Sequence, residues 1–253
     1  MTGHVAEIWR HPIKSHGREE LARVLLSEGR TIPWDRRWAV AHELAKIDFD
    51  APEWAPCGNF SRGSKAPKLQ AISARCNLAA GTVTVTHPEL KDLTIDPDND
   101  ADAGIFIQWI MPISPSNRAL PARLIKAPKR GMTDTDYPSV SILNRASHQQ
   151  VSNRLGQEIS INRWRGNLVL DGLEPWVERD WIGRKIRVGL AELELRENIV
   201  RCMATTASTR TGERDADTLD ALKTGWGHQE FGVYAVVTKT GDLCQGDDIE
   251  VLS

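Results

Sequence analysis

The segment ISINRWRGNLVLDG, residues 159–172, combines a strand pattern with a concentration of basic side chains. In an extended chain, successive side chains point to opposite faces. One face is then polar and carries Arg163, Arg165 and Asn167. The other face is apolar and carries Trp164, Leu168 and Leu170. The polar face is either a cradle for an anion or a solvated surface, and Gly166, which would let a ligand approach the backbone, leaves both interpretations open.

Strand patterns continue on both sides of this segment. Toward the N-terminus, residues 3–10 and 82–86 are typical of strands, with 93–96 as a partner of the latter. Residues 30–43, rich in Trp and Val, predict a long strand or a bent hairpin arm. Toward the C-terminus, further strands are expected at NLVL (167–170), KIRVG (185–189), AELEL (191–195) and FGVYAVV (231–237). The chain is therefore expected to be dominated by short strands.

Three helices interrupt the strands. A Ser-x-x-Gln capping box at Ser147, followed by Gly156, predicts a helix over 148–155. Asp215 as cap and Gly225 as terminator predict a second helix over 216–224. Residues 96–122 contain a third, before a Pro-rich stretch that suggests a domain boundary near residue 120. We expect a mixed, β-rich α+β fold, barrel-like with a few short helices, divided into residues 1–120 and 121–253.

Composition limits the partners of this chain. The 253 residues carry a net charge of only -2, so no global field favours nucleic acid or an anionic membrane, and any basic site must be local. The start, MTGHVAEIWRHPIKS, has no apolar signal region, and no stretch approaches 18 uninterrupted apolar residues. We expect a cytoplasmic protein that binds neither nucleic acid nor membrane.

The four cysteines, at 57, 76, 202 and 244, are far apart and include no Cys-x-x-Cys pair. This spacing favours neither a zinc ribbon nor an iron–sulfur cluster. A lone cysteine is usually a small buried hydrophobe, and we interpret Cys57, Cys76 and Cys244 in this way. Cys202, in NIVRCMATT (198–206), stands beside Arg201, which favours the reactive thiolate. A core cysteine next to an exposed arginine explains the same pattern.

A second basic cluster combines HPIKS (11–15) with PWDRRW (33–38). If residues 34–40 form one strand, Arg36 shares a face with Trp34 and Trp38. A charge on an apolar face is costly unless it is paired or bound to a ligand, so we expect Arg36 in a buried ion pair or at a binding site. Lys14 follows a proline turn and, taken alone, is an ordinary surface lysine.

These clusters, in this order, resemble the MOSC family, named for the C-terminal domain of molybdenum cofactor sulfurases, in members that carry an N-terminal β-barrel domain. The architecture is similar to that of the mitochondrial amidoxime-reducing components and their bacterial counterparts. The resemblance is carried by HPIKS (11–15), DRRWAV (35–40), YPSVSILNRAS (137–147), RWRGNLVLDG (163–172), VRCMATTASTRTGERD (200–215) and FGVYAVVTKTGDLCQGDDIEV (231–251). It implies a β-barrel domain over 1–120 and a MOSC domain over 121–253. His16 and Gly166 stand where some relatives have Cys and Pro.

The resemblance implies a molybdenum–pterin cofactor with Cys202 as the metal ligand and catalytic residue. Candidate cofactor contacts are Lys14, Ser15, Arg36, Ser147, Arg163, Arg165, Asn167 and Arg201. A soft thiolate suits the metal, and arginines, a lysine and a helix N-terminus suit the cofactor's phosphate. Ser147 fits both as a helix cap and as a cofactor contact.

The implied activity is the reduction of N-hydroxylated or related N-oxide and S-oxide compounds by molybdenum. Because the cysteines are scattered, no iron–sulfur cluster is expected in this chain, and electrons should come from a separate electron-transfer protein. The alternative is a cofactor carrier or a sulfur-transfer protein that uses a Cys202 persulfide. In a third interpretation the clusters are structural and Cys202→Ser leaves the metal content unchanged.

Overall fold

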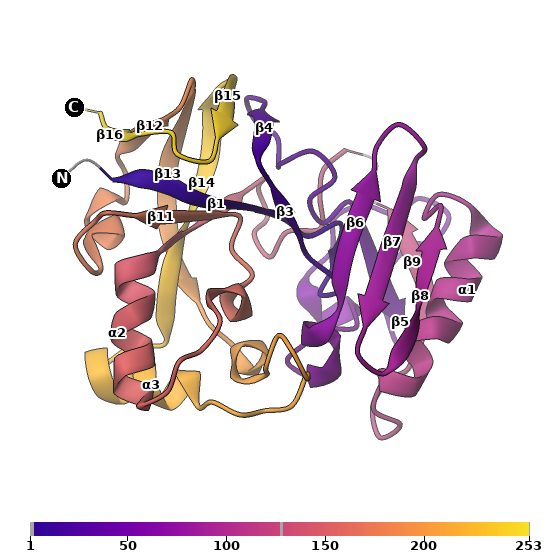
Figure 1. Ribbon diagram of the computed structural model, residues 1–253. Coiled ribbons are helices and arrows are strands. Elements are labelled where there is room, and N and C mark those ends of the chain that lie inside the picture. The colour runs from indigo at the N-terminus through magenta and orange to yellow at the C-terminus, as the bar shows by residue number, and fades with distance from the viewer. Residues whose placement is uncertain (1–2, 127–128, 253) are drawn as a thin grey trace.

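An eight-stranded sheet joins the N-terminal strand to the second half of the chain (Figure 1). The computed structural model describes residues 3–126 and 129–252. The sheet contains, in spatial order, β16 (Ile249–Val251), β12 (Lys185–Val188), β13 (Ala191–Val200), β14 (Glu230–Lys239), β10 (Val140–Asn144), β11 (Leu168–Asp171), β1 (His4–Arg10) and β3 (Glu19–Leu21). Neighbours are antiparallel except β10 and β11, which run parallel. Its inward side chains, among them Ile142, Leu193 and Val233, form the largest apolar core.

Smaller sheets contain most of the remaining first half. One contains β2 (Ile13–Lys14), β5 (Trp38–His42) and β9 (Pro121–Lys126). Another contains β6 (Ser73–Asn77), β7 (Thr82–His87) and β8 (Leu90–Ile95). Helix α1 (Asp100–Ile110) contacts β8 and β9 and buries Phe106, Ile107 and Ile110 (Figure 1). A ribbon of β4 (Arg23–Leu26) and β15 (Gly241–Cys244) links the two halves of the chain.

Helices α2 (Arg145–Leu155) and α3 (Thr218–Trp226) pack against each other beside the large sheet (Figure 1). Short 3-10 helices occupy Cys57–Asn59, Pro67–Ala71, Met111–Ile113, Ile161–Trp164, Val177–Trp181 and Met203–Thr206. Among the described residues, no helix is long and apolar enough to cross a membrane. The expected β-rich α+β fold with a few short helices is confirmed.

The positions of the helix caps differ from those predicted. Helix α2 begins three residues earlier than the capping box suggested, because the side chain of Asn144 accepts a hydrogen bond from the Ala146 amide. Ser147 therefore lies inside the helix, and its prediction as the N-cap is wrong. Helix α3 is capped by Asp217 rather than Asp215 and ends at Gly227 rather than Gly225. Gly156 ends α2 in a left-handed conformation, as predicted.

Two predicted extended segments are bent. Trp34 and Arg36 adopt positive φ angles of 64° and 50°, so the strand in this region begins only at Trp38 and the expected alternation along 34–40 is wrong. In the second segment, Ile161–Trp164 form a 3-10 helix and Arg165 has φ 52°, so the alternation of faces along 159–167 is also wrong. Strand β11 then begins at Leu168. Both bends turn arginines out of the strand direction.

The remaining strand predictions are confirmed. Residues 4–10 form β1, and β7 pairs with β8 in antiparallel register. The division near residue 120 stays a prediction, and strands from both sides of it share sheets. Strand β1 pairs with β11, and β9 pairs with β5. These pairings bring the two halves of the chain together around one cavity.

Candidate functional site

A cavity of about 270 Å³ lies between the two halves of the chain. From the first half it is lined by Lys14, Ser15, Arg36, Cys57 and Arg62, among others. From the second half it is lined by Asp134, Arg163, Arg165, Arg201, Cys202 and Tyr234, among others. Seven of the nine residues predicted from the sequence therefore line one space: Lys14, Ser15, Arg36, Arg163, Arg165, Arg201 and Cys202.

Cys202 is the second residue after β13, at the end of the longest strand pair of the large sheet. Its side chain is free and exposed. The carbonyl of Cys202 accepts hydrogen bonds from the amide and the hydroxyl of Thr205, which fixes the backbone of the following 3-10 helix. Val200 and Met203 on either side are 72% and 45% exposed. The thiol is thus held at an open, partly apolar rim.

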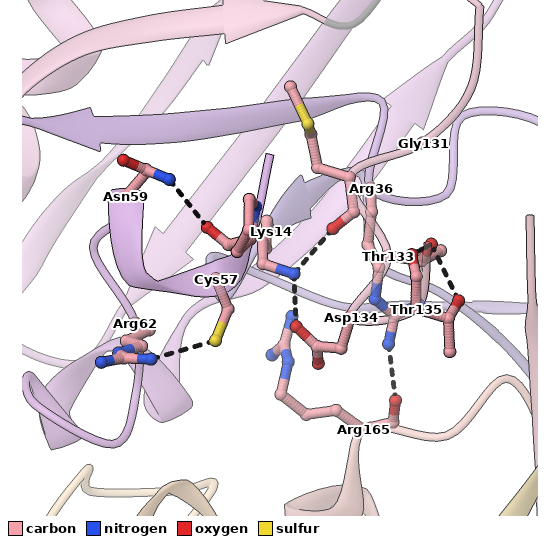
Figure 2. Close-up of polar contacts among 12 residues, drawn as sticks. Lys14, Arg36, Cys57, Asn59, Arg62, Gly131, Thr133, Asp134, Thr135 and Arg165 are labelled. Carbon is pink, nitrogen blue, oxygen red and sulfur yellow. Dashed lines mark hydrogen bonds and ion pairs between the residues drawn. The ribbon is translucent and has the colours of Figure 1, made fainter. Parts of the chain in front are cut away.

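Arg165 provides a charged nitrogen without a partner. Its Nη2 donates to the carbonyl of Gly17 at 2.9 Å, whereas its Nη1 is buried and has no acceptor among the described residues. Burial, together with the nearby charges of Arg36 and Arg18, lowers the pKa of this guanidinium to about 9. Its backbone carbonyl accepts from Arg36 Nη2 at 2.8 Å (Figure 2). Such an unsatisfied cation favours binding of an anion.

Arg201, directly after β13, shows the same arrangement. Its Nε and Nη1 donate to the carbonyls of Phe231 and Trp164 at 2.8 and 2.7 Å. Its Nη2 is buried and, within the described ranges, has no acceptor. Burial lowers the pKa of Arg201 to about 10. Gly232 allows this packing, because a Cβ there would lie 2.5 Å from the Ile142 carbonyl oxygen and 3.3 Å from Arg201 Nη2.

The other predicted cations have carboxylate partners. Lys14 Nζ lies 2.5 Å from Asp134 Oδ1 and also donates to the Met132 carbonyl (Figure 2). Arg36 is paired with Asp35, as expected for an arginine in a buried ion pair. Arg163 is paired with Asp215. In the described part of the chain, Arg62, Arg165 and Arg201 are the lining cations that no carboxylate pairs with, and they give the cavity its surplus positive charge.

Two predicted contacts lie outside the cavity. Ser147 is fully buried in α2, where its hydroxyl donates to the buried carboxylate of Glu178 and accepts from the Trp176 amide. Asn167 Oδ1 accepts from the backbone and hydroxyl of Ser141, and weakly from Arg36 Nη1 at 3.4 Å. Neither residue lines the cavity. Asn167 instead lines an adjoining recess of about 10 Å³, and it contacts Arg36 and Ser141, which line both spaces.

Gly166 also has a different role from the one predicted. A Cβ at this position would lie 2.3 Å from Leu143 Cγ. The glycine therefore allows close packing of the apolar core, and the prediction that it admits a ligand is wrong. Its carbonyl lies 3.1 Å from His11 Nε2.

Four lining residues with reactive or ionisable side chains were not predicted from the sequence: Cys57, Arg62, Asp134 and Tyr234. Cys57, interpreted as a core residue, instead faces the cavity, and Arg62 Nη1 lies 3.0 Å from its sulfur (Figure 2). Strand alternation in FGVYAVV could have found Tyr234, because Val233 and Ala235 beside it point into the apolar core. No local pattern marked Cys57, Arg62 or Asp134.

Comparisons with known proteins match both halves of the chain. The family model described as "MOSC N-terminal beta barrel domain" matches residues 2–109, and the one described as "MOSC domain" matches residues 131–250. The mouse protein named mitochondrial amidoxime-reducing component 1 is 24% identical over 99% of this chain and 82% of its own length. Its human counterpart is 24% identical over 99% of this chain and 83% of its own length.

Of two further matches, one covers a smaller part of this chain and the other has a lower sequence identity. A protein of Anopheles gambiae named molybdenum cofactor sulfurase is 25% identical over 42% of this chain and 15% of its own length. The solved structure of the YuaD protein from Bacillus subtilis gives a TM-score of 0.49 at 13% identity, covering 99% of this chain and 96% of that one. The two domain matches, which together span most of the sequence, show that this chain belongs to the MOSC family, with a MOSC N-terminal beta barrel domain preceding a MOSC domain.

Proposed function

We propose that this protein is a molybdenum–pterin-dependent reductase of N-hydroxylated or related N-oxide and S-oxide compounds. Cys202 would ligate the metal, and a separate protein would supply the electrons. The observation that carries the proposal is an exposed thiol on a cavity whose walls hold two buried guanidinium nitrogens, of Arg165 and Arg201, without acceptors among the described residues. One soft ligand and two unsatisfied cations suit a metal bound to an anionic organic cofactor.

The charges of the cavity fit such a cofactor. A phosphate monoester carries about −1.5 to −2 charges near pH 7. Arg62, Arg165 and Arg201 offer positive charge that no carboxylate in the described ranges neutralises. Arg165 and Arg201 would therefore bind the phosphate most strongly, since their buried nitrogens gain a partner. Lys14, Ser15, Arg36 and Arg163 would shape the walls around the pterin.

The similarities support the same activity. Relatives named for amidoxime reduction align with nearly the whole chain at 24% identity, and another relative is named for the molybdenum cofactor. When bound, the molybdenum centre supplies two-electron removal of an oxygen atom. The protein would hold the metal at the rim through Cys202, balance the cofactor's charge with Arg165 and Arg201, and leave the rim at Val200 and Met203 open to substrate.

The test is turnover of benzamidoxime by protein produced in a host that makes the cofactor, with reduced methyl viologen as electron donor. Benzamidine formation is expected in the wild type and in Cys244→Ala, which removes a free cysteine outside the cavity, and is expected to be lost in Cys202→Ala. Absence of Cys202-dependent turnover in metal-loaded protein, across a panel of N-oxygenated and S-oxygenated compounds, would contradict the proposal.

A second candidate, sulfur transfer, is supported by Cys57. This free cysteine lines the same cavity as Cys202, and Arg62 Nη1 lies 3.0 Å from its sulfur. A sulfur-transfer protein would carry a persulfide on Cys202 and could pass its sulfur between two thiols in one cavity. Purified protein would then contain sulfane sulfur on Cys202 without molybdenum. Molybdenum and pterin in equal amounts, with turnover, would argue against this candidate.

A further inference from the structure

A single carboxylate, that of Asp134, is among the side chains that line the otherwise basic cavity. Lys14 donates to Asp134 Oδ1, and within the described ranges nothing donates to Oδ2 (Figure 2). The Asp134 side chain is 55% exposed although that of Lys14 is only 5% exposed, so the carboxylate is open to the cavity while its partner is buried. Burial alone raises the pKa of Asp134, but Lys14, Arg36 and Arg201 outweigh this and hold it below its ordinary value.

The loop that carries Asp134 is held in place by Arg130. This guanidinium donates to the carbonyls of Thr135 and Tyr137 at 2.6 and 2.9 Å and to the hydroxyl of Thr133 at 2.8 Å. It also lies 5.1 Å from the centre of the Trp54 ring. The indole of Trp54 donates to the carbonyl of Thr133 at 2.9 Å, directly before Asp134. The carboxylate is therefore presented from a fixed loop and is pre-organised to accept hydrogen bonds.

Tyr234 offers the complementary group from strand β14. It lines the same cavity as Asp134 and also a recess of about 10 Å³ that both residues share. Burial raises the pKa of the Tyr234 phenol to about 12, so it stays protonated. In the described part of the chain its hydroxyl makes no hydrogen bond, and it is free to donate to a ligand. The cavity thus places an anionic acceptor and a neutral donor near each other.

We propose that Asp134 and Tyr234 select substrates in which the carbon bonded to the N–O nitrogen also carries a free NH2 group, as in amidoximes and N-hydroxyguanidines. Asp134 accepts from the NH2 group, and Tyr234 donates to the oxygen that leaves. The inference rests on the proposed reductase function. In the reaction an amidoxime takes up two electrons from the external donor protein and two protons, the N–O bond breaks, and an amidine and water are formed. Heteroaromatic N-oxides lack the NH2 group and make only the contact with Tyr234.

The experiment compares benzamidoxime with pyridine N-oxide in metal-loaded protein. Asp134→Asn is expected to lower kcat/KM for benzamidoxime about tenfold, because the charge-assisted hydrogen bond is lost, and to change that for pyridine N-oxide less than about twofold. Tyr234→Phe is expected to lower kcat/KM for both compounds. The matched control is Asp242→Asn, which removes a similarly exposed carboxylate paired with Arg23 on strand β15, outside the cavity, and should change neither.

A binding measurement separates this inference from the proposed activity. Calorimetric titration with benzamidine, the reaction product, should give a Kd about tenfold higher in Asp134→Asn than in the wild type. Where Asp134→Asn does not fold, Asp134→Glu keeps the pair with Lys14 but moves the carboxylate, and should show the same loss for benzamidoxime alone. Asp134-dependent binding without any turnover supports the recognition and overturns the reductase function. Equal losses of kcat/KM for both compounds in Asp134→Asn, or unchanged benzamidine binding in that variant, overturn the inference.

Discussion

Arg165 and Arg201 each keep one buried guanidinium nitrogen without an acceptor among the described residues. Leaving a buried charged donor unsatisfied costs free energy of folding. A bound phosphate group can supply the missing acceptors, so the folded protein should bind anions even without the rest of the cofactor. These two side chains connect the stability of the fold to the proposed function.

Inorganic phosphate should therefore stabilise the wild-type protein. At about ten times its Kd, the expected gain is about 1.4 kcal/mol, or a rise in Tm of about 3 °C for a chain of this length. Arg165→Gln should lose most of this rise in differential scanning fluorimetry. Arg187→Gln, which changes an ion-paired arginine in β12 away from the cavity, should keep it. An equal rise in both variants would show that phosphate binds elsewhere.

The sequence predicted which types of residue line the cavity but not the directions in which the side chains point. Arg163, Arg165 and Cys202 line the cavity, and their contact with a cofactor stays a prediction. Asn167 does not, because the left-handed conformation at Arg165 ends the alternation that placed the two on one face. Backbone conformations of this kind in non-glycine residues have no clear local signal.

At the element scale, the start of α2 shows how tertiary contacts displace a sequence motif. The SHQQ motif satisfies the rule for a capping box, yet Asn144 caps the helix instead. Glu178 explains the difference, because its buried carboxylate accepts from Ser147 Oγ and from Asn144 Nδ2. Burial raises the pKa of Glu178 despite these bonds. The serine is needed inside the helix, which the motif alone could not indicate.

Asn144→Ala should lower the free energy of unfolding by about 2 kcal/mol or more. The substitution removes the helix cap, usually worth about 1 kcal/mol, and leaves the buried Glu178 with one donor fewer. Asn153→Ala, at an exposed position in the same helix, should change it by less than about 0.5 kcal/mol. Urea unfolding measures both. Similar values for the two variants would contradict the structure of this cap.

At the scale of the whole molecule, the β-rich fold followed from strand patterns, but the composition of the cavity did not. Cys57 and Arg62 lie in a part of the chain where the resemblance named no motif, and Asp134 is held by an arginine-centred loop. These residues meet Arg201 and Cys202 because each half of the chain contributes a strand to a sheet of the other half: β1 pairs with β11, and β9 pairs with β5. Contacts between segments so distant in sequence leave no periodic pattern.

Buried histidines make the whole fold sensitive to acid. Burial lowers the pKa of His16 and of His148 to about 4, below the ordinary value of 6.5. As the pH falls, the unfolded chain therefore takes up these protons first, and stability present above pH 6.5 is lost between 6.5 and 4. Each histidine contributes up to about 1.4 kcal/mol per pH unit in this window.

Urea unfolding at pH 7.0, 6.0 and 5.0 should show this loss in the wild type. His16→Gln should give a shallower dependence on pH, whatever its stability at pH 7, whereas Asn153→Ala, which changes an exposed residue that does not titrate, should keep the wild-type slope. A wild-type slope in His16→Gln would show that this histidine does not contribute.

The proposed function depends first on whether Cys202 binds molybdenum in this cavity. The most direct measurement is the molybdenum and pterin content of protein made in a cofactor-competent host, compared among the wild type, Cys244→Ala and Cys202→Ala. We predict close to one molybdenum per chain in the first two and less than about a tenth of that in Cys202→Ala, since the metal loses its protein thiolate. Equal molybdenum in Cys202→Ala and the wild type would show that Cys202 is not the metal ligand.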